Sequence, residues 1–152
     1  MSGLGGYVAR WLAGDTELAP ITELLGIEPV SAGDGRAEVV LAADERLHNA
    51  MGTLHGGVLL DLADVAMGVA MATALDDGET FSTLGSSIAY LRPVRRDRLT
   101  AAARVVHRGR TTGHLECDIH DGEGELVARV TSVCAIRSRR SPSPPGMPGP
   151  AD

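Results

Sequence analysis

Residues 55–75, HGGVLLDLADVAMGVAMATAL, form a nearly all-apolar stretch that opens on His-Gly-Gly and carries only two charges, Asp61 and Asp64. A helix that is apolar on every face must be enclosed by protein or lipid. A carboxylate inside such a helix must find a partner or shift its pKa upward and act as a base. The Gly-Gly start leaves N–H groups of the first turn unpaired and open to an oxygen that gains negative charge. The stretch therefore predicts both an oxyanion hole and a base.

The two features, Gly56 and Asp64, cannot act on one small group within a single chain. Asp64 follows Gly56 by eight residues, which places it about 12 Å further along a helix axis. An antiparallel pair of these helices across a two-fold axis would bring the partner's Asp64 to each Gly56. The helix therefore predicts a dimer.

Length and composition indicate the class of protein that contains this helix. A chain of 152 residues that is 43% apolar and 22% charged suits one soluble domain with a real core. The N-terminus has no basic-then-apolar run with a cleavage site, so we expect no export. Two aspartates interrupt the long apolar stretch, so we expect no membrane insertion and place the protein in the cytoplasm. The net charge of −6 disfavours a nucleic-acid partner. Cys117 and Cys134 lack CxxC spacing, which indicates reduced core thiols.

Periodicity predicts the remaining elements. We expect short helices over 4–13 and 20–25, a strand or hairpin over 26–42 around the Gly-Asp-Gly at 33–35, a polar loop over 44–54, and strands over 80–91, 99–107, 112–120 and 126–137 with a hairpin turn at 121–124. This divides the chain into an N-terminal helical extension (1–19), a main domain (20–138) and a Pro/Gly-rich tail (139–152) that we expect to be disordered. The order predicts an α+β fold, an antiparallel sheet that curls around one buried helix.

Three segments carry a resemblance to a known family. Residues 48–57 read HNAMGTLHGG, residues 62–64 read LAD, and residues 90–93 read YLRP. The pattern N-x-x-G-x-x-H-G-G-x-x-x-x-L-x-D resembles that of hotdog-fold acyl-CoA thioesterases of the phenylacetate-pathway (PaaI-like) type, over about residues 20–137. The resemblance implies a hotdog fold whose antiparallel sheet wraps one long central helix, a homodimer that pairs into a homotetramer, and active sites built across the dimer interface.

The resemblance also implies roles for individual residues. The Gly56 N–H would polarise the thioester carbonyl, His55 and Asn49 would line the same pocket, Asp64 of the other subunit would be the catalytic carboxylate, and Thr83 would help to hold the attacking water. An acyl-CoA would be the substrate, with neither a metal nor a cofactor. The expected substrate-binding residues are Gly57, Tyr90, Arg92, Pro93, Arg95, His107, Arg108, Gly109, Arg110 and Thr111.

Alternative interpretations remain open from the sequence. Asp64 could be a carboxylate satisfied by a neighbouring hydroxyl, and His55 could simply cap the helix. The arginines could form a solvated strand face. A non-catalytic acyl-CoA-binding hotdog protein is the second function class, and a hotdog dehydratase or hydratase is a third, although the interval from His55 to Asp64 does not match its layout. The presence of Asp64 favours hydrolysis over binding alone, and the carboxylate could act either as general base or as nucleophile.

Overall fold

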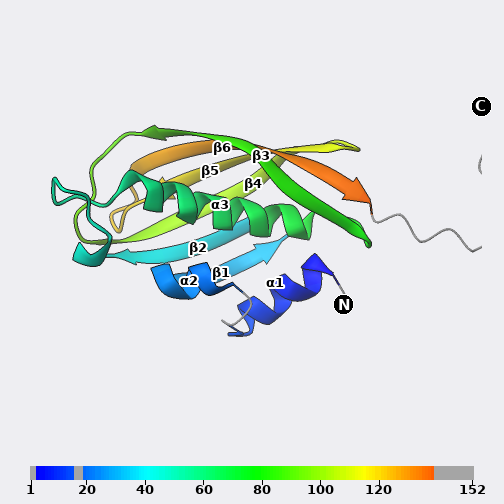
Figure 1. Ribbon diagram of the computed structural model, residues 1–152, viewed down its shortest axis with the longest axis horizontal. Helices are drawn as coiled ribbons and strands as arrows, with labels where there is room; N and C mark the ends of the chain where they lie inside the picture. The colour runs from blue at the N-terminus through cyan, green and yellow to red at the C-terminus, as the bar shows by residue number, and fades with distance from the viewer. Residues whose placement is uncertain (1–2, 16–18, 139–152) are drawn as a thin grey trace, which may run out of the picture.

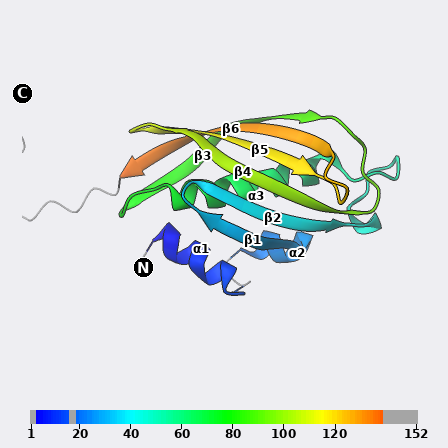
Figure 2. The ribbon, with the colours of Figure 1, turned by 180° about the vertical axis from the view of Figure 1, so that it is seen from behind.

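The computed structural model describes residues 3–15 and 19–138, and the expected disordered tail at 139–152 lies outside these described residues. Six antiparallel strands form one sheet that curves around helix α3 (Gly56–Thr73). The helix lies against the concave face of the sheet in both views (Figures 1 and 2). The predicted α+β architecture, a sheet wrapped around one long helix, is confirmed.

The strands run in the order β1-β2-β4-β5-β6-β3, so β1 and β3 are the two edges of the sheet. Their bounds are β1 Ile27–Gly33, β2 Arg36–Ala43, β3 Glu79–Tyr90, β4 Asp97–Arg108, β5 Thr112–His120 and β6 Leu126–Ser138. All six lie within about two residues of the predicted positions, and the stretch 26–42 is a hairpin rather than a single strand. Its turn places Asp34 and Gly35 at positive φ, 50° and 71°, which is typical of a tight two-residue hairpin turn.

Helix α3 is enclosed by protein over much of its surface. Its buried side chains are Leu59, Leu62, Ala63, Ala66, Met67, Val69, Ala70, Met71 and Ala72. By length and mean hydropathy (1.5) the helix could cross a membrane, but half of its residues are buried inside the protein, as expected for a core helix. Its end is fixed by Thr73, whose hydroxyl accepts the Gly35 N–H at 2.9 Å and donates to the Ala70 carbonyl at 2.8 Å.

The N-terminal helices α1 (Leu4–Leu12) and α2 (Pro20–Leu25) lie beside β1 (Figures 1 and 2). Val8 and Trp11 of α1 are buried, and both belong to the hydrophobic core that also contains the buried face of α3. Helix α1 of the predicted N-terminal extension is therefore packed into the main core. Its amphipathic pattern with a single tryptophan is the sequence signal for this packing.

The two edge strands differ in exposure. Strand β1 has seven residues and is contacted by α1 and α2. Strand β3 has twelve residues, and most of them from Thr83 to Tyr90 are exposed in the single chain. A long, exposed edge strand is a template for pairing with another chain. Both buried cysteines, Cys117 and Cys134, are free thiols as predicted.

Candidate active site

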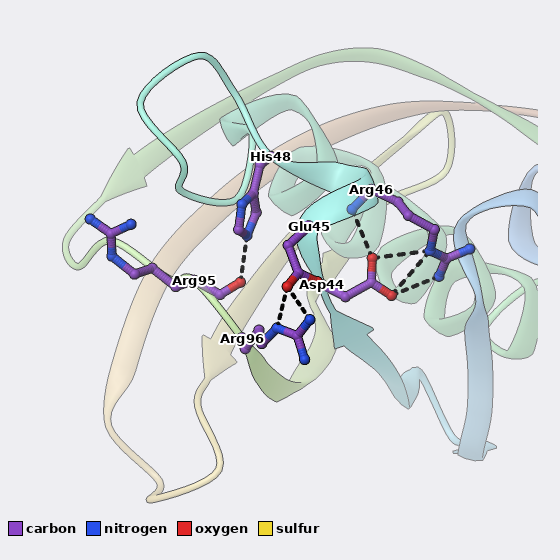
Figure 3. Close-up of polar contacts among 6 residues, drawn as sticks. All are labelled: Asp44, Glu45, Arg46, His48, Arg95 and Arg96. Atoms are coloured by element: carbon purple, nitrogen blue, oxygen red, sulfur yellow. Dashed lines mark hydrogen bonds and ion pairs between the residues drawn. The ribbon is translucent and has the colours of Figure 1, made fainter.

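The loop that leads into α3 is fixed by polar contacts (Figure 3). It begins with the short 3₁₀ helix η2 (Glu45–Leu47), whose first turn is capped by the Asp44 carboxylate through the Arg46 N–H at 2.9 Å. The Glu45 carboxylate pairs with Arg96, and His48 Nε2 donates to the Arg95 carbonyl at 2.8 Å. These contacts join the loop to the segment after β3, so both segments are held at the N-terminal end of α3.

Asn49 organises the next turn of the loop. Its side-chain oxygen accepts the Met51 N–H at 2.9 Å and the Thr53 N–H at 3.3 Å, and its side-chain nitrogen donates to the Thr53 hydroxyl at 3.0 Å. Asn49 lines the same pocket as His55 and Gly56, as the resemblance implies. The hydrogen bonds of its side chain are with Met51 and Thr53 of its own loop.

The start of α3 corrects the expectation that both glycine N–H groups are open. His55 is the N-cap, and its Nδ1 accepts the Gly57 N–H at 2.9 Å. The Val58 N–H donates to the His55 carbonyl at 3.0 Å. The Gly56 N–H, at the first helical position, has no acceptor within the helix. Gly56 is therefore the residue whose N–H can bind an oxyanion, whereas Gly57 serves the cap.

Neighbouring side chains explain why positions 56 and 57 are both glycine. A Cβ on Gly56 would stand 2.9 Å from the ring of Tyr90, and a Cβ on Gly57 would stand 3.0 Å from His55 Nδ1. The Tyr90 hydroxyl donates to the Gly56 carbonyl at 3.1 Å. A cavity of about 490 Å³, which we call the Gly56 pocket, opens here between the loop 49–57 and the segment 90–94.

The predicted substrate-binding residues at the end of β3 and just after it all lie at this end of α3. Tyr90, Arg92 and Pro93 line the Gly56 pocket. The Arg92 guanidinium forms an exposed ion pair with Glu125 at 2.8 Å, and Arg95 Nη1 donates to the Gly52 carbonyl at 2.9 Å. Arg92 therefore lines the pocket, Arg95 binds the neighbouring loop, and both side chains are exposed.

Asp64 lies in a different cavity, the Asp64 pocket, of about 240 Å³. Its walls are mostly apolar side chains of α1, α2, α3 and β3. Although part of Asp64 faces solvent in the single chain, the surrounding protein withdraws water and raises the pKa of the carboxyl, and the charge of Asp61 raises it further. A hydrogen bond with Thr83 acts in the opposite direction. Thr83 therefore adjoins Asp64, on the strand where the resemblance expects it.

The turn 107–111 lies elsewhere. The guanidinium of Arg108 pairs with Glu79 and, at 3.2 Å, with Asp76, both just beyond the C-terminal end of α3. The Gly109 N–H donates to the Thr112 carbonyl at 2.8 Å and closes the turn. A single chain does not bring this turn together with the Gly56 pocket, since the whole of α3 separates them. Arg108 also has carboxylate partners that a phosphate would have to replace.

Sequence reasoning did not assign two further groups to the site. The walls of the Asp64 pocket include Tyr7 and Trp11 of α1 and Ile21 of α2. Asp61, which the motif leaves out, acts on Asp64 through its charge. The i,i+3 spacing of the two aspartates was a usable signal for the second group.

Comparisons with known proteins agree with this geometry. Residues 51–128 match the family described as the thioesterase superfamily. The chain is 31% identical over 120 residues to a 1,4-dihydroxy-2-naphthoyl-CoA hydrolase of Listeria monocytogenes, which covers 79% of this chain and 98% of that protein. It is 33% identical over 105 residues to the acyl-coenzyme A thioesterase PaaI of Escherichia coli, covering 68% and 73%.

The similarity extends to three dimensions. The structure of the E. coli PaaI protein from the phenylacetic acid degradation operon superimposes with a TM-score of 0.76 at 27% identity, covering 88% of this chain and 95% of that chain. The fold is therefore a hotdog fold, and the protein is an enzyme that hydrolyses thioesters. The chain belongs to the thioesterase superfamily, with PaaI among its homologues.

Proposed function

We propose that the protein is an acyl-CoA thioesterase whose active site is shared between two subunits, with Asp64 as general base and the partner chain's copy of the Gly56 N–H as oxyanion donor. One observation carries this proposal. Gly56 and Asp64 line two separate cavities of the same chain, and their eight-residue interval corresponds to about 12 Å of helix. A thioester carbonyl and its attacking water need both groups within about 3 Å.

Strand β3 supplies the means of assembly. It is the open edge of the sheet, and antiparallel pairing of two β3 strands would join two sheets and set two α3 helices side by side. In an antiparallel pair of helices, each Asp64 can lie beside the Gly56 of its partner. We propose this homodimer as the minimal active unit, and a pair of such dimers as the homotetramer.

The reaction then follows from the two groups. Asp64 accepts a proton from a water held with Thr83, and the water oxygen forms a bond with the carbonyl carbon of the thioester. The carbonyl oxygen becomes negative and is stabilised by the Gly56 N–H and by the positive end of the α3 dipole. Collapse of this intermediate breaks the carbon–sulfur bond, and Asp64 returns its proton to the departing CoA thiolate. A raised pKa suits Asp64 to this exchange because it makes the carboxylate a stronger base.

The same two-fold arrangement explains how the two predicted CoA-binding segments would meet. The segment 90–95 lies at the N-terminal end of α3 and the turn 107–111 at its C-terminal end. In this arrangement the start of the partner's α3 lies beside Asp64. The partner's segment 90–95 then lies toward the C-terminal end of the first chain's α3, where the first chain's turn 107–111 is. Arg92, Arg95 and Arg110 would then bind the phosphates of CoA. We place the enzyme in the cytoplasm, where CoA thioesters are its substrate.

The test is hydrolysis of CoA thioesters by the purified protein, monitored by release of the free thiol. The proposal expects turnover that persists in excess chelator. Tight binding of acyl-CoA without thiol release would instead identify a non-catalytic binding protein.

A further inference from the structure

The chemistry proposed for Asp64 does not account for the cavity beside it. Hydrolysis requires a carboxylate, a water and an oxyanion donor, all of which could lie at an open surface. Asp64 is partly exposed, yet it also lines the Asp64 pocket, whose outer wall is built by the N-terminal helices. Tyr7 and Trp11 of α1 and Ile21 of α2 face this pocket opposite α3, and Phe81 of β3 closes one side.

The pocket extends from Asp64 toward the C-terminal end of α3. Val65, Gly68, Val69 and Ala72 line it after Asp64, so it follows the helix for about 12 Å. Gly68 widens it one turn beyond Asp64, because a Cβ there would meet only the Phe81 ring, at 3.7 Å. A thioester carbonyl held at Asp64 can therefore direct its acyl group along this wall.

The walls offer little to a polar or charged acyl group. Asp64 is the one charged side chain among the described residues that line the pocket. Thr22 is buried, and its hydroxyl already donates to the Ala19 carbonyl at 2.7 Å. Burial raises the pKa of Tyr7, which keeps its phenol neutral. An anionic acyl group would find no cation here and would be repelled by Asp64.

The volume limits the size of the occupant. A cavity of about 150 Å³ lined by apolar side chains binds benzene, so about 240 Å³ has room for roughly eight to ten carbon atoms on that scale. We propose that helices α1 and α2 form the acyl pocket of the enzyme, and that this pocket selects uncharged, apolar acyl groups of roughly eight to ten carbons, aliphatic or aromatic. This inference rests on the proposed thioesterase function and specifies its substrate class.

The first test compares kcat/KM of the native enzyme on acetyl-, succinyl-, octanoyl- and phenylacetyl-CoA. Each buried methylene adds to transition-state binding, so kcat/KM for octanoyl-CoA should exceed that for acetyl-CoA by at least about 100-fold. The value for succinyl-CoA should be equally low, because its acyl group is anionic. Phenylacetyl-CoA, with eight acyl carbons, should also exceed both. Equal kcat/KM values for acetyl- and octanoyl-CoA would overturn the proposal.

The second test uses matched substitutions on α2. Ile21 is 48% exposed and lines the pocket, whereas Leu24 is 74% exposed and does not. Ile21→Trp fills the pocket and should lower kcat/KM for octanoyl-CoA about 10-fold while leaving butyryl-CoA within about twofold. Leu24→Trp should change neither value. Equal effects of the two substitutions, or no effect of either, would contradict an acyl site at α2.

The third test separates the pocket from the reaction. Trp11 is the single tryptophan of the chain and is buried in the pocket wall, so its fluorescence reports occupancy. S-octyl-CoA, a thioether that cannot be hydrolysed, should shift the Trp11 emission in a saturable manner, whereas CoA alone should not. If the enzyme hydrolysed no CoA thioester but Trp11 responded, only the proposed function would fail. An unchanged emission at saturating S-octyl-CoA would overturn the acyl pocket itself.

Discussion

The Gly56 pocket and the Asp64 pocket use the same helix in different ways. At its start, α3 contributes a backbone N–H, which is kept accessible by a glycine and by the cap that His55 gives to Gly57. Two turns later, α3 contributes a carboxylate whose pKa is raised because the protein withdraws water from it. The first pocket is lined in part by the exposed Arg92, and the walls of the second are mostly apolar. The difference is what the proposed shared site requires: each chain would supply one of the two groups, and the partner chain would supply the other.

The largest expected effect comes from removing the base. Asp64→Asn should lower kcat by about 10² to 10⁴-fold, because the amide cannot accept the proton of the water. Asp61→Asn, the same chemical change three residues earlier, is the matched control and should keep kcat within about threefold. A loss of less than about threefold in Asp64→Asn would mean that Asp64 is not the base.

The same variant makes a prediction about stability. A carboxyl whose pKa is raised by folding favours folding below its ordinary pKa, and this contribution is lost as the pH rises through the raised pKa. Ionised Asp64 therefore destabilises the fold at neutral pH. We expect Asp64→Asn to have an equal or higher Tm at pH 7 by calorimetry, with a smaller difference near pH 3. A clearly lower Tm at pH 7 would contradict the assigned cause of the shift.

A pair of substitutions tests which edge of the sheet forms the dimer. Leu84 on β3 and Val30 on β1 are both exposed apolar residues (63% and 50%) at bulges of their edge strands. Leu84→Arg should weaken the dimer about 10- to 100-fold, since it removes the burial of one large apolar side chain. Val30→Arg should leave the dimer intact. Sedimentation at a series of concentrations measures both, and the reverse order would move the interface to β1.

The pH dependence should respond to the two neighbours of Asp64 in opposite directions. Activity requires ionised Asp64, so kcat/KM falls as the pH drops through its raised pKa. Asp61→Asn removes a negative charge and should shift this acidic limb to lower pH, whereas Thr83→Val removes a hydrogen bond to the carboxylate and should shift it to higher pH. Shifts in the same direction would show that another group controls the limb.

The smallest expected effect concerns the arginines. Replacing Arg108 and Arg110 together by Ala should raise KM for a CoA thioester about threefold to tenfold with little change in kcat, and the effect should shrink at high salt. Because Arg108 is bound to Glu79 and Asp76, most of the change should come from Arg110. A pantetheine thioester, which lacks the nucleotide phosphates, is the control. An equal loss on both substrates would point to a structural defect.

The sequence predicted the fold closely because its patterns are local. The apolar run of α3, the alternation in β5 and β6, and the turns at 33–35 and 121–124 are each determined by neighbouring residues. The helix-start motif also placed Gly56, His55 and Asn49 around one pocket. The cap that occupies Gly57 depends on the ring orientation of His55, which spacing does not encode. The ion pairs of Arg108 and the walls of the Asp64 pocket join segments far apart in the chain, so no local pattern could predict them.

The central claim, that two chains complete one site, is tested most directly by mixing two inactive variants. Asp64→Asn lacks the base. Gly56→Val blocks the oxyanion donor, and it also displaces Tyr90 because even a Cβ at position 56 would stand 2.9 Å from the Tyr90 ring. Each homodimer should be inactive. After unfolding and joint refolding, a heterodimer contains one site with an intact Gly56 and an intact Asp64, so activity should return to about half of the native value per heterodimer. No recovery, with heterodimers shown to be present, would place the whole site within one subunit and contradict the account.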